Sequence, residues 1–255
     1  VATDDDLGDD LIVTIVATIS PNDKPKPLTA NITELSQNDN HTEYKLLVLG
    51  LGDGASRAVE QMAERIPNKR GLYPIINIDF AIAHTDLHQL ERFDVPRKLQ
   101  LGSKRGLGHS TLEAVRQLTE QSESEIRTLL DGYDMVFLVV GLGGHTGTGS
   151  APVVAHIAKE MGIPCVAVVT TPFVFEGIKR QQVAQDGLIT LSKEANCVIN
   201  IDNNKLREMH NDSSFEELLQ HSNDVVRHTV LNIFSIFISP RRYLYKKKKK
   251  MKKKR

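Results

Sequence analysis

The chain has 255 residues, of which 40% are hydrophobic and 25% charged, so it is long enough to bury one sizeable core with a smaller appendage. No apolar run approaches the roughly 20 residues that a membrane-spanning helix needs. The numbers of basic and acidic residues are equal, but 11 of the 32 basic residues and no acidic residue lie in residues 240–255. The rest carries 21 basic and 32 acidic residues, a net charge of −11. Such an acidic body is common among soluble cytoplasmic proteins and gives no sign of specific nucleic-acid binding.

The first 43 residues divide into a β segment and a linker. Residues 1–18 contain the run Leu-Ile-Val-Thr-Ile-Val-Ala-Thr at 11–18, which follows a turn marked by acidic residues and Gly8. Its β-branched residues predict a strand. Residues 19–43 are rich in Pro, Asn, Asp and Thr and poor in apolar residues, which predicts a flexible linker.

A strand, a glycine-rich turn and a helix open the main domain, which we expect to span residues 44–238. The run Tyr-Lys-Leu-Leu-Val-Leu at 44–49 predicts a buried strand. It leads into Gly50-Leu-Gly-Asp-Gly-Ala-Ser-Arg57 and a helix to about Arg65. This order is the first nucleotide-binding unit of many α/β folds, and a Gly-x-Gly alone suits a dinucleotide site equally well.

A second strand is expected over residues 74–83, followed by His84-Thr-Asp-Leu-His-Gln-Leu90. His84 and His88 are four residues apart, a spacing that suits a metal if both lie on one helix. No third ligand is evident in the sequence, and we predict no metal site of the protein's own. Further along, apolar and charged residues between Ser110 and Leu130 follow a helical spacing, which predicts one amphipathic helix.

The strongest pattern lies between Asp134 and Gly162. The apolar run 134–140 predicts a buried strand of a parallel sheet, and five glycines follow within the nine residues 141–149. We then expect a helix over 151–160, with Pro152 in its first turn and Gly162 as its C-cap.

Glycines allow backbone N–H groups to face one concavity, and the N-terminus of the following helix adds partial positive charge. Thr146, Thr148 and Ser150 would add hydroxyl donors. The stretch therefore predicts a phosphate-binding loop. The alternative is a tight turn whose glycines serve close packing alone.

The sequence Gly-Gly-x-Thr-Gly-Thr-Gly at 143–149, with Pro-Val-Val-Ala close behind it, closely resembles the signature loop of the tubulin/FtsZ family of GTPases. It lacks the lysine of a Walker A loop. The resemblance covers about residues 44–237 and implies an α/β fold, a Rossmann-like parallel sheet with helices on both faces and GTP across the carboxyl ends of the strands. It implies GTP-binding residues in two loops: Gly52, Asp53, Gly54, Ala55, Ser56 and Arg57 in the first, and Gly144, His145, Thr146, Gly147, Thr148 and Gly149 in the second.

Further segments resemble the family in the same order along the chain. Pro172-Phe-Val-Phe-Glu-Gly-Ile-Lys-Arg180 matches a family segment, which implies that Glu176 binds the ribose hydroxyls and Arg180 stacks on guanine. The resemblance also implies that Asn203 contacts the purine and that Asp224 accepts hydrogen bonds from guanine. The alternatives are a surface ion pair for Glu176 and Arg180, and a solvated helix carboxylate for Asp224.

The first loop and its surroundings also depart from the family. Asp53, Ala55, Ser56 and Arg57 stand where the family has nearly unbroken glycine ending in asparagine. A carboxylate at position 53 disfavours phosphates, and Arg57 offsets this in part. Lys104-Arg-Gly-Leu-Gly-His109 resembles the loop that faces the γ-phosphate, with histidine where small residues are usual.

Past Phe237 the resemblance ends. The family's Asn-x-Asp-x-x-Asp loop, which completes the site of a neighbouring subunit, is absent, so we expect no catalytic residue in this chain and expect the second domain to be missing. Residues 8–18 resemble the last strand of that second domain, or are an unrelated edge strand. We expect residues 239–255 to be a basic low-complexity tail. It would either bind nucleic acid or anionic membrane nonspecifically or reflect a frameshift, and we favour the frameshift because no aromatic or amphipathic pattern accompanies the charges.

By resemblance the chain is a truncated or divergent GTPase of bacterial cell division. It would bind GTP or GDP with Mg²⁺, assemble head-to-tail with like subunits and meet division-site proteins. Cys165 and Cys197 read as reduced core residues, so we expect a cytoplasmic protein at the division site. One alternative is a non-hydrolysing module that binds or caps filaments. Another is an NAD-dependent oxidoreductase that uses the glycines of residues 50–52 and needs an acidic residue near the end of the second strand, where Asp79 lies.

Overall fold

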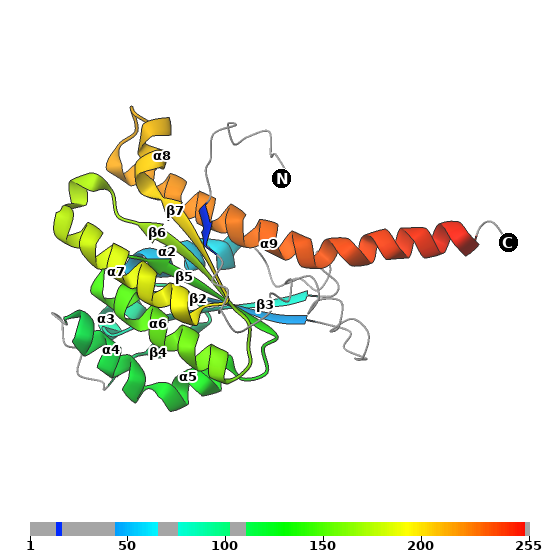
Figure 1. The fold of residues 1–255 in the computed structure, drawn as a ribbon, viewed down its shortest axis with the longest axis horizontal. Helices are drawn as coiled ribbons and strands as arrows, with labels where there is room; N and C mark the ends of the chain where they lie inside the picture. The colour runs from blue at the N-terminus through cyan, green and yellow to red at the C-terminus, as the bar shows by residue number, and fades with distance from the viewer. Residues whose placement is uncertain (1–13, 17–43, 66–75, 103–110, 253–255) are drawn as a thin grey trace.

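The computed structural model describes residues 14–16, 44–65, 76–102 and 111–252 and shows an α/β fold built on a seven-stranded sheet (Figure 1). The strand order is β1-β7-β6-β5-β2-β3-β4. The strands are β1 (Thr14–Val16), β2 (Tyr44–Leu51), β3 (Ile76–His84), β4 (Arg97–Gln100), β5 (Met135–Gly141), β6 (Cys165–Thr171) and β7 (Cys197–Asp202). Strands β2 to β7 pair in parallel, which confirms the predicted fold class. β1 pairs antiparallel with β7.

Helices cover both faces of the sheet. They are α2 (Asp53–Arg65), α3 (Leu87–Glu91), α4 (Leu112–Gln121), α5 (Glu123–Leu130), α6 (His145–Glu160), α7 (Ile178–Glu194), α8 (Asn203–Met209) and α9 (Phe215–Lys252), with a 3₁₀ turn η1 (Val174–Glu176). Side chains alternate along each strand, so that Leu47 faces the core under α5, α6 and α7. Its neighbour Val48 faces the core under α2, α3, α8 and α9.

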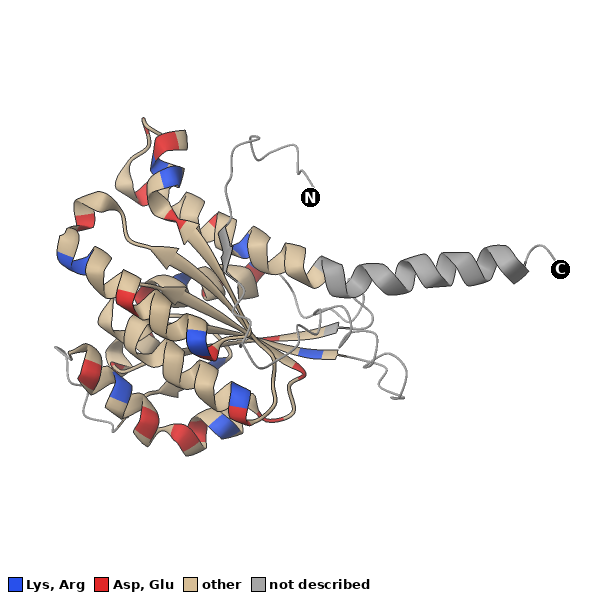
Figure 2. Ribbon diagram, in the orientation of Figure 1, with Lys and Arg blue, Asp and Glu red and all other residues tan. Residues whose placement is uncertain are grey.

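The central strands are apolar on both faces because both faces are covered. All residues of β5 from Met135 to Val140 are buried. Charged residues lie mostly on the helices, as Figure 2 shows. None of the helices in the described part of the chain has the length and hydrophobicity that a membrane span requires.

The predicted helix between Ser110 and Leu130 is two helices, α4 and α5, that meet at Ser122. The Ser122 hydroxyl donates to the carbonyl of Leu118 at 3.1 Å and accepts the backbone N–H of Gly102 at 2.7 Å. A serine can satisfy backbone groups in this way and so interrupt a helix. The expectation of one helix was wrong because the partner at Gly102 is distant in sequence.

Helix α6 begins at His145, six residues earlier than predicted. Pro152 therefore lies inside the helix rather than in its first turn, and it has no N–H to donate to the carbonyl of Thr148. The other end is as predicted: Gly162 has φ +71°, and the bonds from its N–H to Lys159 and from Ile163 to Ala158 form a Schellman motif.

Helix α9 begins at Phe215, directly after a pair of reciprocal hydrogen bonds. The Ser214 hydroxyl accepts the N–H of Glu217 at 3.3 Å, and the Glu217 carboxylate accepts the N–H of Ser214 at 2.7 Å. These reciprocal bonds are a capping box, and the bonds that the Glu217 carboxylate accepts from the N–H and the hydroxyl of Ser214 lower its pKa. The helix continues to Lys252 and so runs into the predicted basic tail. The predicted linker at 19–43 and the loop at 104–109 lie outside the described residues.

Candidate functional site

A pocket of about 710 Å³ opens where the carboxyl ends of β2, β3, β5 and β6 meet, the usual place for a ligand in a parallel α/β sheet. Its lining comes from the strand ends, the N-termini of α2 and α6, and the segment that joins β6 to α7. The lining residues are Leu51, Gly52, Asp53, Gly54, His84, Thr85, Asp86, Gln89, Thr111, Leu112, Gly141, Leu142, Gly144, His145, Thr146, Gly147, Thr170, Thr171, Pro172, Glu176, Lys179, Arg180, Asn203 and Leu219.

The N-terminus of α6 forms one wall of the pocket. Its N-cap is Gly144, and no side chain makes a capping hydrogen bond there. The first N–H groups of a helix have no acceptor within the helix, and the helix dipole places partial positive charge beside them. This end of α6 is therefore suited to an anionic group.

The two glycine-rich turns approach each other so closely that side chains would not fit between them. Gly52 has φ +85°, and a Cβ atom there would lie 3.1 Å from the backbone nitrogen of Gly147. A Cβ atom at Gly147 would lie 2.8 Å from the carbonyl oxygen of Gly141 and 2.9 Å from that of Leu51. Close approach of backbone to backbone requires glycine at both positions.

Most of the residues that the sequence predicted to bind GTP line this pocket. They are Gly52, Asp53, Gly54, Gly144, His145, Thr146, Gly147, Glu176, Arg180 and Asn203. Residues that are far apart along the chain are thus brought together. The predicted residues outside the lining are Ala55, Ser56, Arg57, Thr148, Gly149 and Asp224.

Two of the predicted hydroxyl donors are used inside the protein. The buried Thr148 hydroxyl accepts the N–H of Gly143 at 2.9 Å, and the Ser150 hydroxyl donates to the carbonyl of Thr146 at 2.6 Å. Of the three hydroxyls, only that of Thr146 lines the pocket, where it lies 3.1 Å from the hydroxyl of Thr85.

The rest of the first loop and Gly149 support the fold. Ala55 and Ser56 are buried, and the Ser56 hydroxyl has no hydrogen-bond partner among the described residues. Arg57 is exposed. A Cβ atom at Gly149 would lie 2.9 Å from the carbonyl oxygen of Leu112, so this glycine permits close packing of α6 on the start of α4.

Glu176 and Arg180 contact each other at the pocket wall. The Glu176 carboxylate lies 2.8 Å from the Arg180 guanidinium and also accepts the N–H of Phe173 at 2.8 Å. Asn203 is buried, and its side-chain oxygen accepts the hydroxyl of Ser222 at 2.8 Å. These groups combine a carboxylate, a guanidinium and an amide on one side of the cavity.

Asp224 lies on α9 in a different environment. Its carboxylate is 3.2 Å from Arg65 at the end of α2 and 3.2 Å from Arg227. It also lies 3.5 Å from the side-chain amide of Gln220. The base-recognising role stays a prediction, and it would require this carboxylate to exchange partners.

Asp53 and His84 meet at the other side of the pocket. The His84 Nε2 atom is 3.4 Å from the Asp53 carboxylate, and Nδ1 accepts the N–H of Asp86 at 2.8 Å. Burial lowers the pKa of His84 below its ordinary value of 6.5, although the carboxylates of Asp53 and Asp86 act to raise it. The described residues hold no cluster of three or more His, Cys, Asp or Glu side chains that could bind a metal ion.

Sequence reasoning missed several lining residues. Thr170 and Thr171 end β6, and Thr85 follows β3. Their position at carboxyl ends of parallel strands was the signal that could have found them. Lys179 and Leu219 carried no such signal, because their helices are placed by tertiary packing.

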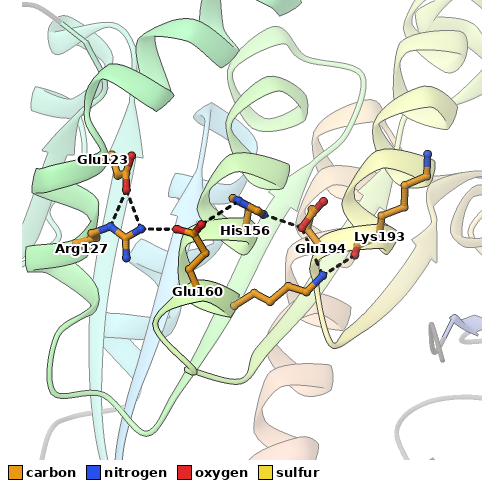
Figure 3. A network of polar contacts seen from close by, with 7 residues as sticks. Glu123, Arg127, His156, Glu160, Lys193 and Glu194 are labelled. Carbon is orange, nitrogen blue, oxygen red and sulfur yellow. Dashed lines mark hydrogen bonds and ion pairs between the residues drawn. The ribbon is translucent and has the colours of Figure 1, made fainter. Parts of the chain in front are cut away.

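A second groove, of about 460 Å³, lies between α4, α6 and α7. Its lining includes the carboxylates of Glu113, Glu120, Glu123, Glu160, Asp186 and Glu194. Several of these belong to a network of ion pairs across α5, α6 and α7 (Figure 3). So many carboxylates disfavour an anionic ligand, so the pocket at the strand ends is the candidate site for a nucleotide.

Known proteins resemble both the sequence and this arrangement. The GTPase domain of the tubulin/FtsZ family matches residues 45–211, more than half of the chain. The chain belongs to the tubulin/FtsZ family. A cell division protein FtsZ from Mycoplasmopsis pulmonis is 37% identical over 195 residues, which cover 76% of this chain and 48% of that protein. One from Coxiella burnetii is 45% identical over 166 residues, covering 64% of this chain and 41% of that protein.

Solved structures of the family have the same fold. The structure of an empty FtsZ dimer from M. jannaschii matches with a TM-score of 0.69 at 30% identity, covering 84% of this chain and 60% of that one. CetZ1 from Haloferax volcanii matches with a TM-score of 0.62 at 22% identity, covering 72% of this chain and 58% of that one, which supports the fold alone. The tubulin/FtsZ chain described here spans about half the length of the curated relatives it matches.

Asp79, the acidic residue on which the oxidoreductase alternative relied, is outside the pocket lining. Asp79 lies within β3, five residues before its end. Its carboxylate accepts the hydroxyl of Tyr133 at 2.6 Å and lies 3.8 Å from Arg97. This residue is therefore held away from the carboxyl edge of the sheet, where an NAD ribose would bind.

Proposed function

We propose that this chain is the GTP-binding part of an FtsZ-like protein of bacterial cell division and holds GTP or GDP in the pocket at the strand ends. The observation that supports this most is the meeting of two glycine turns, in which a Cβ atom at Gly147 would collide with the carbonyl oxygens of Gly141 and Leu51. Such a cradle leaves room for phosphate oxygens beside backbone N–H groups. The tubulin/FtsZ GTPase family to which the chain belongs adds the nature of the ligand.

The pocket suggests how the nucleotide would be held. The N-terminus of α6 and the Thr146 hydroxyl would bind phosphates, because both can donate hydrogen bonds to anionic oxygens. On the wall formed by η1 and the start of α7, Glu176 would accept the ribose hydroxyls and Arg180 would stack on the base. Asn203, already buried at this wall, would offer its amide group to the purine.

A Mg²⁺ ion fits the chemistry of the phosphate end, where the carboxylate of Asp53 lines the pocket. Mg²⁺ is usually held by one or two carboxylates together with phosphate oxygens of the substrate. When bound, it would supply neutralisation of charge on the phosphates. The protein would supply the carboxylate and the backbone N–H groups.

Hydrolysis and assembly go beyond this single chain. The relatives carry the name cell division protein FtsZ. We therefore propose that the protein works in the cytoplasm at the division site, assembles head-to-tail with FtsZ-like subunits and contacts other division-site proteins. Residues 1–255 contain no Asn-x-Asp-x-x-Asp sequence, so the activating carboxylates would have to come from outside these residues.

A second candidate is a module that binds or caps filaments without hydrolysing nucleotide. The internal pairing of Glu176 with Arg180 at 2.8 Å favours it, because both groups predicted to hold the nucleotide already satisfy each other. The carboxylate of Asp53 among the phosphate-binding groups favours it too. This module would bind GTP weakly or not at all.

Equilibrium binding of labelled GTP, ATP and NAD to the full chain with Mg²⁺ tests the proposal. We expect GTP to bind more tightly than ATP, and NAD to bind least. In Glu176→Gln the affinity for GTP should fall by roughly 10-fold or more, since a charged hydrogen-bond acceptor is lost.

Glu194→Gln, near the other end of α7, is the matched control and should bind GTP as the wild type does. Circular dichroism verifies that each variant is folded. A folded wild-type chain that binds none of the three nucleotides would exclude the GTPase proposal and leave the filament-binding module.

A further inference from the structure

Asp53 lines the pocket in which we propose that the phosphates bind. It is the first residue of α2, and 62% of its side chain is exposed. The neighbouring wall is the uncapped N-terminus of α6. A phosphate bound there would lie in the same cavity as the carboxylate.

The contact with His84 does not neutralise this carboxylate. The Nδ1 atom of His84 accepts the backbone N–H of Asp86 at 2.8 Å, so it carries no proton. The ring is therefore the neutral tautomer with its proton on Nε2, the atom that lies 3.4 Å from Asp53. A neutral imidazole orients the carboxylate and leaves its negative charge in place.

Among the described residues, no cation of the pocket pairs with Asp53. Arg180 is paired with Glu176, and its guanidinium lies near Gly144, 3.9 Å from where a Cβ atom of that glycine would be. Lys179 belongs to the same helix. Arg57 is exposed on α2 and is outside the lining. Among the described residues, His84 is the one ion-pair partner that the structure gives Asp53.

Two other carboxylates of the described pocket lining have backbone partners. Asp86 is the N-cap of α3 and accepts the N–H of His88 at 2.9 Å, and Glu176 accepts the N–H of Phe173. Asp53 pairs with a side chain, and 62% of its own side chain is exposed, so it is the carboxylate that we assign to a ligand at the phosphate end.

We propose that Asp53 makes nucleotide binding depend on a divalent cation, because its carboxylate binds the Mg²⁺ carried by the phosphates, directly or through water. Without the cation, the carboxylate would repel the phosphates, whereas a bound cation would attract both anionic groups. This inference rests on the proposed nucleotide-binding function. According to this inference, Asp53 weakens nucleotide binding without Mg²⁺ and strengthens it with Mg²⁺.

The test measures the GTP dissociation constant of the full chain in Mg²⁺ and in EDTA, for the wild type, Asp53→Gly and Asp53→Asn. When Mg²⁺ is removed, the wild type should lose GTP affinity on the order of 100-fold. Both variants should lose only roughly 10-fold, because they lack the repulsion between the Asp53 carboxylate and the phosphates. In EDTA the two variants should bind GTP more tightly than the wild type. Glu160→Gln, at the other end of α6, should keep the wild-type ratio.

Equal ratios in the wild type and both variants would overturn the role of Asp53 while leaving GTP binding intact. Tighter binding by the variants in both conditions would also overturn it, because Asp53 would then repel the nucleotide whether or not Mg²⁺ is present. Failure of all folded proteins to bind GTP in either condition would overturn the proposed function itself. The three results are distinct.

Discussion

The two ends of helix α6 have opposite chemistry. At the N-terminus, Gly144 gives the helix no side-chain cap, and the backbone there lines the pocket. At the C-terminal end, His156 lies 3.0 Å from Glu194 on α7 and 3.4 Å from Glu160. Glu160 in turn pairs with Arg127 on α5, so that one network ties three helices together (Figure 3).

The C-terminal end of α6 carries groups that bind other parts of the protein, whereas the N-terminal end carries groups that are available to a ligand. In the network, each charged side chain has an opposite charge beside it, and exposed pairs of this kind contribute only about 0–1 kcal/mol each to stability. At the N-terminus, backbone donors are left without a protein partner by the helix geometry itself. This N-terminal end is therefore the end of α6 at which we propose a ligand.

The largest expected effect comes from adding a side chain near the N-terminus of α6. Gly147→Ala should weaken GTP binding by roughly 100-fold or more and lower the free energy of unfolding by about 1–3 kcal/mol, because an added Cβ in tight packing forces a backbone shift. It would meet the carbonyl oxygens of Gly141 and Leu51 at 2.8 and 2.9 Å. Urea unfolding and equilibrium binding measure the two effects.

Gly54→Ala is the control for this variant. A Cβ atom at Gly54 meets nothing within 4 Å, so stability should stay the same or rise slightly, as expected when alanine replaces glycine in a helix. If Gly147→Ala behaved like Gly54→Ala, the close approach of the two turns would have no role in binding.

Asp224 could be either a structural carboxylate or a ligand-binding one, and a substitution can distinguish the two roles. Its pairing with Arg65 and Arg227 resembles the network, whereas the sequence assigns it to guanine. If it binds guanine, Asp224→Ala should weaken GTP binding by roughly 10- to 100-fold and abolish the preference over ATP, since a charged hydrogen bond to the base is lost.

Arg65→Ala separates the two roles. It removes the ion pair with α2 and keeps the carboxylate, so GTP binding should stay the same or become tighter. If Arg65→Ala lost as much GTP binding as Asp224→Ala, then Asp224 would act through its ion pair with Arg65 and not by direct contact with guanine.

The parts of the fold and site that depend on neighbouring residues in the sequence could be predicted from it. Apolar runs that end at glycine predicted β2, β5 and the turn at Gly141, because a buried parallel strand needs apolar side chains on both faces. Gly162 was identified as a helix end because a positive φ favours glycine. The order of strands and turns then placed both glycine loops at one edge of the sheet.

What the sequence could not predict depends on contacts between distant segments. Glycine disfavours a helix locally, yet α6 begins at His145 because Gly147 and Gly149 let it approach Leu51 and Leu112. Ser122 divides α4 from α5 through the distant amide of Gly102. The ion pair between Asp224 and Arg65 likewise depends on how α9 packs against α2.

Cys165, at the start of β6 just after α6, gives a smaller effect that depends on pH. Burial raises the pKa of its thiol to about 12 from the ordinary value of 9.0. The unfolded thiol ionises above pH 9, whereas the folded thiol stays protonated, so the unfolded state binds fewer protons and stability falls as pH rises from 9 towards 12. At pH 10 this loss should amount to about 1 kcal/mol.

Urea unfolding at pH 8 and pH 10 tests this expectation. Cys165→Ala should be less stable than the wild type at pH 8 because of the lost side-chain volume, but it should lose less stability between the two pH values. A wild type and a variant with the same pH dependence would show that this thiol does not ionise on unfolding in that range.

The smallest effect is expected at the satisfied end of α6. His156→Ala removes contacts to Glu160 and Glu194, yet 55% of the histidine side chain is exposed, so the free energy of unfolding should fall by about 1 kcal/mol or less. GTP affinity should not change, because the α6 N-terminus that we propose to bind the phosphates keeps its geometry. Urea unfolding at low and high salt measures the first quantity, and the difference should shrink at high salt as the ion pairs are screened. A marked loss of GTP binding in a folded His156→Ala protein would mean that the two ends of α6 are coupled, and that the network helps to position the phosphate-binding turn.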